Sequence, residues 1–336
     1  MEPLVSILIP AFNAQQYIGD SLMSAVNQTW PNKEIIVVDD GSSDDTRSIV
    51  ETFEKAGVRV LTQENQGAAA ARNKALSLSS GEYIQWLDAD DLLSPNKVAA
   101  QVEALRRYPD RRTVISSSWG QFFHRPSRAT FKSNGLWCDL TPVEWLTRKM
   151  EQNVYMQTAT WLVPRAVTEA AGPWDTGLLG DDDGEYFARI LLASEQVCFV
   201  PEAKVFYRAS GTNSLSYIGH SDKKMEAQLR SMRLNIDYVR SLDDSERVRA
   251  ACVKYLENWL INFYPERLDL VDQAMQLARE LGGELALPAF SWKYAGLAAA
   301  CGPGVAKRAR IQLPRMKWAV ISWWDKMMHR AQEHSA

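Results

Sequence analysis

The chain has 336 residues, of which 46% are hydrophobic and 24% are charged, and its formal net charge is −3. This length allows one large domain or two modest ones, and the charge gives no argument for a nucleic-acid partner. The four cysteines form no Cys-x-x-Cys pair, which disfavours zinc and redox sites and indicates reduced thiols. The first residues lack a basic stretch, and no apolar run has the roughly 18 residues of a membrane-spanning helix. We therefore expect a cytoplasmic protein without a signal peptide.

The first hundred residues alternate between short apolar runs and segments with helical spacing. The apolar runs predict strands at residues 4–9, 34–38, 58–61 and 83–87. Apolar residues at helical spacing predict helices at residues 17–26, from about 44, and at 68–78. Strands that alternate with helices indicate an α/β fold, with a mostly parallel central sheet flanked by helices.

An acidic turn ends the fourth predicted strand. Asp88, Asp90 and Asp91 follow it, and Ser94 and Pro95 are predicted as the N-cap and first residue of the next helix. Open α/β sheets bind ligands at the carboxyl ends of their strands. Carboxylates spaced Asp-x-Asp can hold a divalent cation and reach a ribose hydroxyl. The simpler interpretation is a solvated turn that caps a helix.

The rest of the chain changes character near residues 110 and 220. Short strands are predicted at 113–119, 161–163 and 197–200, and we expect them to complete the same sheet and to add a second wall to the cleft. After residue 220, apolar residues recur at steps of three and four and predict three amphipathic helices. Such stripes are more typical of core packing than of a cofactor site.

Five short motifs then occur in a fixed order: SILIPAFN at 6–13, VVDDGSSD at 37–44, NQG at 65–67, ARN at 71–73 and LDADD at 87–91. This series resembles the family 2 inverting glycosyltransferases of the GT-A fold, over about residues 4–215. The resemblance implies a Rossmann-like sheet with a nucleotide-sugar-binding half at 1–110 and an acceptor and catalytic half at 111–220. Residues 221–336 would form an α-helical C-terminal extension.

The resemblance assigns the nucleotide to the ends of the first two strands. The backbone of Pro10, Ala11, Phe12 and Asn13 can approach a flat base. Asp40, or alternatively Asp39, would accept the N3–H of a uracil, whereas the competing interpretation of this pair is helix capping by residues 42–44.

The diphosphate and ribose are assigned to the next two motifs. Arg72 is a candidate for charge-assisted hydrogen bonds to the diphosphate, and the competing interpretation is an ordinary surface arginine. Asp88 would hold the ribose hydroxyls, with Ala89 beside it, and Asp90 would coordinate a Mg²⁺ or Mn²⁺ that bridges the phosphates. We expect Asp91 to be a supporting or helix N-terminal acid.

Inverting transfer also needs a base that takes the proton of the acceptor hydroxyl. The stretch GDDDGEYFAR at 180–189 resembles the acidic motif of the family. Counting back from Arg189 along the family's motif places the catalytic aspartate at Asp183. Asp182 stays the alternative, because the family more often has Glu-Asp at these two positions, where this chain has Asp-Asp. Adjacent carboxylates should raise one another's pKa, which suits a base. A solvated acidic loop is the simpler interpretation.

The end of the matched region offers weaker candidates. Arg208, followed by residues 214–216, resembles the segment that closes over the donor phosphates in relatives. His220 could reach the metal, although a surface histidine is the simpler interpretation.

Residues 303–330 carry seven Lys and Arg against one acid, interleaved with three tryptophans. An amphipathic helix of this composition can lie in an anionic membrane interface. We expect either peripheral attachment to the cytoplasmic face of a membrane or a helix that docks on the protein.

Together these features predict a metal-dependent inverting glycosyltransferase that uses a nucleoside diphosphate sugar, with UDP as the default nucleotide, and a glycan or lipid-linked acceptor. A sugar-nucleotide pyrophosphorylase would need a Gly-rich basic loop after the first strand, and Pro10-Ala11-Phe12-Asn13 is no such loop. A catalytically degenerate binding module is disfavoured because Asp90 and Asp183 are both present.

Overall fold

The computed structural model describes residues 2–108, 112–209, 221–289 and 291–333. Its first sheet has the strand order β3-β2-β1-β4-β8. The strands are β1 (Val5–Ala11), β2 (Lys33–Asp39), β3 (Val58–Thr62), β4 (Tyr83–Trp86) and β8 (Val163–Pro164). The first four are mutually parallel, and β8 runs antiparallel to β4. The four strands predicted in the first hundred residues and their mostly parallel sheet are therefore confirmed.

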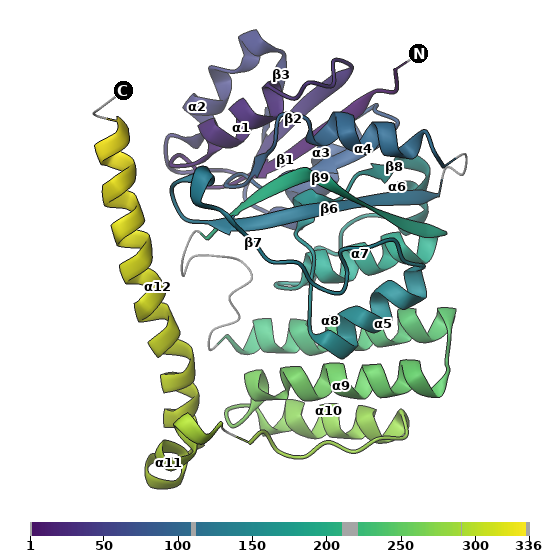
Figure 1. Ribbon diagram of the computed structural model, residues 1–336, viewed down its shortest axis with the longest axis vertical. Helices are drawn as coiled ribbons and strands as arrows, with labels where there is room; N and C mark the ends of the chain where they lie inside the picture. The colour runs from purple at the N-terminus through teal and green to yellow at the C-terminus, as the bar shows by residue number, and fades with distance from the viewer. Residues whose placement is uncertain (1, 109–111, 210–220, 290, 334–336) are drawn as a thin grey trace.

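Helices cover both faces of this sheet (Figure 1). They are α1 (Ile18–Val26), α2 (Thr46–Glu51), α3 (Ala68–Leu78) and α4 (Lys97–Leu105). Because side chains alternate along a strand, Ile7 and Ile9 of β1 pack in one core with α1, α2 and α4, whereas Leu8 packs in the other with α3. Burial on both faces explains the continuous apolar run that predicted β1.

The start of α4 differs from the prediction. The helix begins at Lys97 with Asn96 as its N-cap, not at Pro95. Ser94 instead continues the pairing of β5 (Leu92–Leu93) with β9, since Ser94 N donates to the Lys204 carbonyl and Ser94 Oγ accepts from Lys204 N. The sheet contact keeps this serine out of the helix.

A second sheet has the strand order β5-β9-β6-β7. Its longest strands are β6 (Thr113–Phe122) and β9 (Gln196–Arg208), which pair in parallel, and β7 (Thr130–Phe131) is antiparallel to β6. The prediction that strands 113–119 and 197–200 complete the first sheet is therefore wrong. The physical reason is that β8 occupies the free edge of β4, so β6 pairs along its length with β9, and one bridge from Ile115 to Leu162 connects the sheets.

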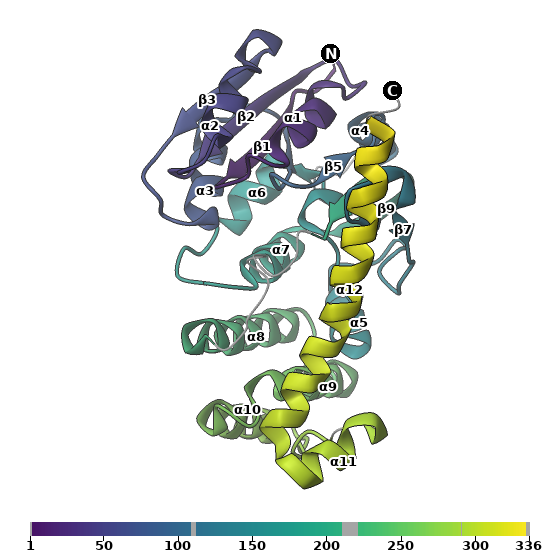
Figure 2. The same cartoon turned by 90° about the vertical axis from the view of Figure 1, so that its left-hand side faces the viewer.

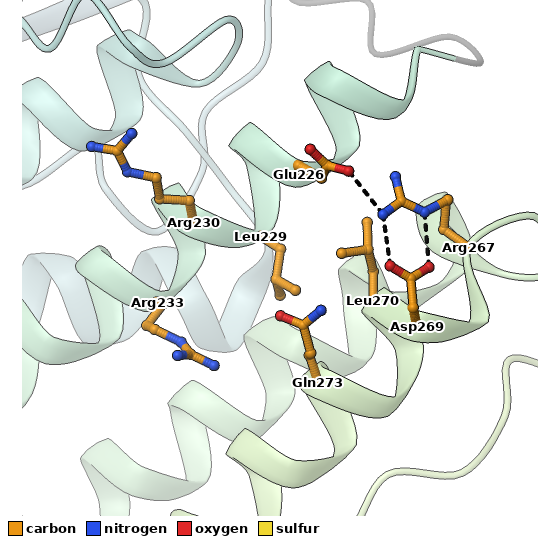
Figure 3. Close-up of a pocket in the computed structure, with 8 residues that line it drawn as sticks. All are labelled: Glu226, Leu229, Arg230, Arg233, Arg267, Asp269, Leu270 and Gln273. Carbon is orange, nitrogen blue, oxygen red and sulfur yellow. Dashed lines mark hydrogen bonds and ion pairs between the residues drawn. The ribbon is translucent and has the colours of Figure 1, made fainter.

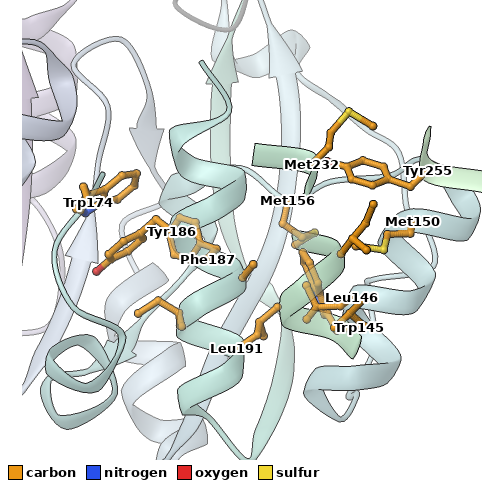
Figure 4. Packing of buried hydrophobic residues seen from close by; sticks show 14 of the residues in the cluster. Trp145, Leu146, Met150, Met156, Trp174, Tyr186, Phe187, Leu191, Met232 and Tyr255 are labelled. Carbon is orange, nitrogen blue, oxygen red and sulfur yellow. The ribbon is translucent and has the colours of Figure 1, made fainter. Parts of the chain in front are cut away.

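Helices of the second half pack beside the sheets. They are α5 (Pro142–Gln152), α6 (Arg165–Ala171), α7 (Asp182–Ala193), α8 (Asp222–Leu242), α9 (Glu246–Phe263) and α10 (Leu268–Glu280). The last three are the predicted amphipathic helices and form a stack below the sheets in Figure 1. One continuous core joins this stack to α5, α7 and the first sheet. Figure 4 shows part of this core, in which Met232 and Tyr255 face Met150, and Trp145 lies nearby. The division of the chain at residues 110 and 220 stays a prediction.

The chain ends with α11 (Trp292–Cys301) and α12 (Pro303–Glu333). The long helix α12 runs alongside the molecule, from the level of the helical stack to that of the sheets (Figures 1 and 2). None of the described helices combines the length and apolar character needed to cross a bilayer.

Candidate functional site

An aromatic cluster joins the elements that carry the predicted acidic and basic residues. Trp86, the last residue of β4, is fully buried and packs edge-to-face against Trp174 and Tyr186, at centroid distances of 5.3 and 6.1 Å. Trp174 and Tyr186 stack on each other at 3.9 Å, as Figure 4 shows. Asn73 of α3 donates to the Trp174 carbonyl and accepts from the Trp174 N–H. The cluster therefore fixes β4, α3 and α7 relative to one another.

Arg72 of α3 connects the acidic turn to α7. Its Nη2 donates to Asp88 Oδ1 at 2.9 Å and its Nη1 to Asp182 Oδ2 at 2.8 Å. The guanidinium carbon lies 4.4 Å from the ring centroid of Trp174, and the side chain is only 7% exposed. Burial opposes the charge, but the two carboxylates raise the pKa of Arg72 above its ordinary value. Arg72 is thus no surface arginine, and its contact with a diphosphate stays a prediction.

Three consecutive aspartates lie at the start of α7, and the first has a structural task. Asp181 is the N-cap, with the left-handed φ of 55°. Its Oδ2 accepts hydrogen bonds from Ser231 Oγ at 2.6 Å and from Gln228 Nε2 at 3.2 Å. Asp181 therefore ties the start of α7 to α8.

Asp182 and Asp183 differ in their electrostatic surroundings. Asp182 forms the ion pair with Arg72, whereas Asp183 Oδ1 accepts the N–H of Gly184 at 2.9 Å. Burial and the charges of Asp182 and Asp181 raise the pKa of Asp183 to about 7. This agrees with the expectation that neighbouring carboxylates raise one another's pKa, and a carboxylate of that pKa is suited to accept a proton near neutral pH.

The other acids of the turn after β4 lie against Arg208 at the end of β9. Arg208 N donates to Asp91 Oδ1 and Arg208 Nε to the carbonyl of Asp90, both at 2.8 Å. Ala89 accepts a hydrogen bond from Ser21 Oγ at 2.9 Å through its own carbonyl. Arg208 is 3% exposed, so it stabilises the acidic turn from the buried side. A contact of Arg208 with the donor phosphates stays a prediction.

Three further residues hold Arg208 in place. Its Nη2 pairs with Asp20 Oδ2 at 3.0 Å, and its guanidinium carbon lies 4.6 Å from the ring centroids of both Tyr17 and Phe122. The sequence analysis assigned no role to these three. Nothing in the local pattern could have indicated them, because Asp20 and Tyr17 lie almost two hundred positions from Arg208.

The acidic turn fits a divalent cation chemically. Among the described residues, no group forms a hydrogen bond with the buried Asp91 Oδ2, and burial, together with the charges of Asp90 and Asp88, raises the pKa of Asp91 well above its ordinary value. Within the described ranges, no three His, Cys, Asp or Glu side chains form a set that could hold a metal ion. Mg²⁺ usually takes only one or two carboxylates and fills its shell with phosphate oxygens and waters, so Asp90 could hold Mg²⁺ or Mn²⁺ with a bound diphosphate.

The ends of β1 and β2 meet at the same edge of the sheet. Pro10 and Ala11 are buried, Phe12 is 50% exposed, and Asn13 has a φ of 47°. Asn13 Oδ1 accepts the N–H of Ser43 at 2.8 Å, which links the two strand ends. The exposed Phe12 ring is therefore available to a flat ligand at this edge.

Asp39 and Asp40 are almost completely buried. Asp39 Oδ1 accepts hydrogen bonds from the N–H and hydroxyl of Ser42. Asp40 Oδ1 accepts from Gln66 N at 2.9 Å and from the side chain of Gln63, and its Oδ2 accepts from Gly67 N at 2.8 Å. A carboxylate can accept about four hydrogen bonds, so Asp40 retains capacity for one more donor such as an imide N–H.

Residues 214–216 and His220 are outside the described residues. A pocket of about 380 Å³ lies between α8 and α10 (Figure 3), and none of the aspartates of the turn or of α7 lines it. Its Arg267 is already paired with Glu226 and Asp269, so this pocket is not the predicted cleft.

Comparisons with known proteins agree with this fold. Residues 6–153 match the model of glycosyl transferase family 2. TuaG of Bacillus subtilis (strain 168), whose name proposes a glycosyltransferase of teichuronic acid biosynthesis, is 45% identical over 105 residues, which are 30% of this chain and 42% of that protein. WfgD of Escherichia coli, a UDP-Glc:alpha-D-GlcNAc-diphosphoundecaprenol beta-1,3-glucosyltransferase, is 36% identical over 146 residues, which are 40% of this chain and 58% of that protein. The chain thus spans about half the length of these relatives.

A solved structure resembles nearly the whole chain. The crystal structure of S. aureus TarS 1-349 in complex with UDP-GlcNAc superposes with a TM-score of 0.68 and covers 92% of this chain and 91% of that one. The sequence identity is 17%, so this likeness establishes the fold, helical C-terminal region included.

Proposed function

We propose that the chain is a family 2 glycosyltransferase, as the match of residues 6–153 to that family's model supports, and that it transfers a sugar from a nucleoside diphosphate sugar to a hydroxyl group, with inversion at the anomeric carbon. The observation that carries the proposal is the Arg72 bridge. It joins Asp88, at the predicted ribose position, to Asp182, which is the chain neighbour of the predicted base. The residue proposed to bind the ribose and the neighbour of the proposed base are thereby held by one guanidinium.

The donor is proposed to be a UDP-sugar. The name of WfgD contains UDP-Glc, and the TarS structure contains UDP-GlcNAc. Asp40, with its remaining acceptor capacity, would receive the uracil N3–H, and the exposed ring of Phe12 would cover the base. Asp88 would hold the ribose hydroxyls.

Asp90 is proposed to hold Mg²⁺ or Mn²⁺. When bound there with the donor, the ion would offset the negative charge that develops on the leaving diphosphate. The buried Oδ2 of Asp91, which has no hydrogen-bond partner within the described ranges, supports a cation in this turn. Arg208 fixes the turn's backbone from behind, so the carboxylates of the turn need little reorganisation.

Asp183 is proposed as the base and Asp182 as its positioning neighbour. The acceptor oxygen forms a bond to the anomeric carbon while the bond from that carbon to the diphosphate breaks, and Asp183 takes the hydroxyl proton. Asp182 is the weaker candidate because its ion pair with Arg72 stabilises its charged form. Asp183 has a raised pKa, and in the described part of the chain no Lys, Arg or His forms an ion pair with its carboxylate.

The acceptor is proposed to be a glycan or a lipid-linked glycan of the cell envelope. WfgD is named for a diphosphoundecaprenol-linked acceptor and TuaG for teichuronic acid biosynthesis. Both names concern cell-envelope glycans, and this shared class supports the proposal without fixing the linkage.

The test is UDP release from a panel of UDP-sugars, with Mn²⁺ and lipid extracts or glycans as acceptors. We expect one donor to be turned over by the wild-type chain, and Asp90→Ala and Asp183→Asn to be inactive. Activity that survives in both variants would contradict the assignment. Cleavage of the donor by added pyrophosphate to UTP and a sugar 1-phosphate would instead indicate pyrophosphorylase-like chemistry, and donor binding without turnover would indicate a degenerate module.

A further inference from the structure

The polar side of α12 faces the rest of the molecule. Asp325 is 8% exposed, and its carboxylate accepts hydrogen bonds from His124 N, Arg125 N and Arg125 Nε at 2.9, 3.1 and 2.7 Å. One end of the helix is held by Lys307, which is 3% exposed and donates to the Asn262 carbonyl and to Glu266 at 2.8 and 2.6 Å. These contacts agree with the docked helix that the sequence analysis weighed.

The side of α12 that points away from these contacts is apolar. At about 100° per residue, Met316 lies directly opposite Asp325 and Lys307, and its apolar neighbours lie within about one quarter of a turn. Their exposed fractions range from 50% to 66%, and the residues are Leu313, Met316, Val320, Trp323, Trp324 and Met327. A docked helix normally shows the reverse arrangement, with its apolar side inward. We call these six residues the outward face of α12.

The charges around the outward face are positive. Arg308, Arg310 and Lys317 are exposed on the helix, and Arg330 continues the series at its end. Asp325 does not neutralise these cations, because its carboxylate lies on the inner side of the helix and forms an ion pair with Arg125. The outward face therefore combines tryptophans and aliphatic side chains with neighbouring cations.

We propose that the outward face of α12 binds the surface of an anionic lipid membrane, with the helix lying in the interface. Tryptophan rings are favoured at the boundary between headgroups and acyl chains, and each Lys or Arg near an anionic leaflet adds attraction. A second copy of the chain is a poorer occupant, since pairing two such faces would bring the cations on the flanks of both helices together. An exposed apolar face of this extent marks an interaction surface and not ordinary solvent contact.

The inner contacts connect the outward face to the candidate site. His124 and Arg125 follow the end of β6 after one residue, and Phe122, the last residue of β6, packs against Arg208. In the view of Figure 2, α12 passes in front of β9. A membrane-bound α12 would thus place the acidic turn close to a membrane-borne acceptor. This consequence rests on the proposed function, whereas the proposal of membrane binding does not.

The experiment is vesicle sedimentation with the full chain. Vesicles that contain phosphatidylglycerol are compared with vesicles of phosphatidylcholine alone. We expect the wild type to bind the anionic vesicles, with a blue shift of tryptophan fluorescence. Val320→Glu/Trp323→Glu should weaken binding at least about tenfold, because two apolar side chains lose their burial in the interface.

Matched controls test whether vesicle binding depends on the outward face of α12 or on exposed apolar side chains in general. Leu242 and Leu268 are apolar side chains with 41% and 55% exposure on α8 and α10, and Leu242→Glu/Leu268→Glu should bind vesicles like the wild type. Both double variants should keep the Tm of the wild type, since none of the four side chains is buried. Arg310→Glu/Lys317→Glu should lose the preference for phosphatidylglycerol.

Three results would overturn the proposal. They are failure of the wild type to bind vesicles, equal binding by the outward-face variant, and a dimer in analytical ultracentrifugation that Val320→Glu/Trp323→Glu dissociates. UDP release without vesicles, measured in the same preparations with glycans or detergent-solubilised lipid extracts as acceptors, would show independently whether the proposed transferase activity fails.

Discussion

Arg72 Nη1 donates to Asp182 Oδ2 across 2.8 Å, although the two residues lie 110 positions apart in the chain. The same guanidinium holds Asp88 and lies against Trp174. The contact therefore joins the turn after β4 to the start of α7. It also makes the surroundings of Asp182 and Asp183 different, because Asp182 forms the ion pair with Arg72.

Replacing Arg72 should destabilise the fold. Arg72→Met leaves Asp88 and Asp182 without their buried cation, and breaking a buried pair costs about 3–5 kcal/mol. Urea unfolding of the purified variant measures this loss.

Arg47→Met is the matched control for this substitution. Arg47 pairs with Glu51 on the surface of α2, where its side chain is 60% exposed, and such pairs contribute at most about 1 kcal/mol. Equal losses of unfolding free energy in the two variants would show that the Arg72 bridge stabilises the fold no more than a surface ion pair does.

Asp183→Asn should give an enzyme that is more stable but inactive. Between pH about 4 and 7 the unfolded chain has released the proton of Asp183, whereas the folded chain retains it, because folding raises its pKa to about 7. Stability conferred by this group therefore falls as the pH rises through that window. Asparagine removes the effect, so the variant should gain of the order of 2–4 kcal/mol at pH 8 after allowance for solvent screening.

The same pKa predicts the pH profile of transfer. The base must be ionised, so kcat/KM of the wild type should rise about tenfold per pH unit below pH 7 and level off above it. Asp183→Asn should lower kcat by about 10²–10⁴ at all pH values. If Asp182→Asn has the larger effect on kcat and the pH profile persists in Asp183→Asn, the base is the neighbouring aspartate.

Asp90→Ala should abolish the response to metal. In the wild type we expect EDTA to remove activity, and Mn²⁺ together with UDP to raise Tm more than UDP alone, since a ligand that binds only the folded chain stabilises it. The variant should show no additional Mn²⁺ shift. Asp45→Ala, at an exposed carboxylate before α2, is the control and should respond like the wild type.

Asp40→Ala should weaken UDP binding and destabilise the fold. Gln66 N and Gly67 N lose their acceptor at the start of α3, which costs about 1–3 kcal/mol for groups left unsatisfied. Isothermal titration with UDP should show at least a tenfold loss of affinity, because the acceptor for the uracil imide is absent. Asp44→Ala also removes hydrogen bonds, to Thr46 and Gln15, and should leave UDP affinity unchanged.

The sequence by itself determined the first sheet and the list of candidate residues. Strands such as β1 are recognisable because both faces are buried, which makes the run continuously apolar, and the polar residues that follow mark the edge where ligands bind. The aspartates after β4 and at the start of α7 stand out for the same local reason. The three helices after residue 220 were predictable because an amphipathic stripe repeats within one segment.

Only the tertiary structure decided how distant segments combine. A strand such as β6 carries no local mark of its partner, so the second sheet could not be predicted. Adjacent aspartates look alike in sequence, and only the ion pair of Asp182 with Arg72 distinguishes Asp183 as the carboxylate without that cation. In α12 the spacing predicts an amphipathic helix but not which side faces inward, since that depends on partners such as Arg125, two hundred positions away.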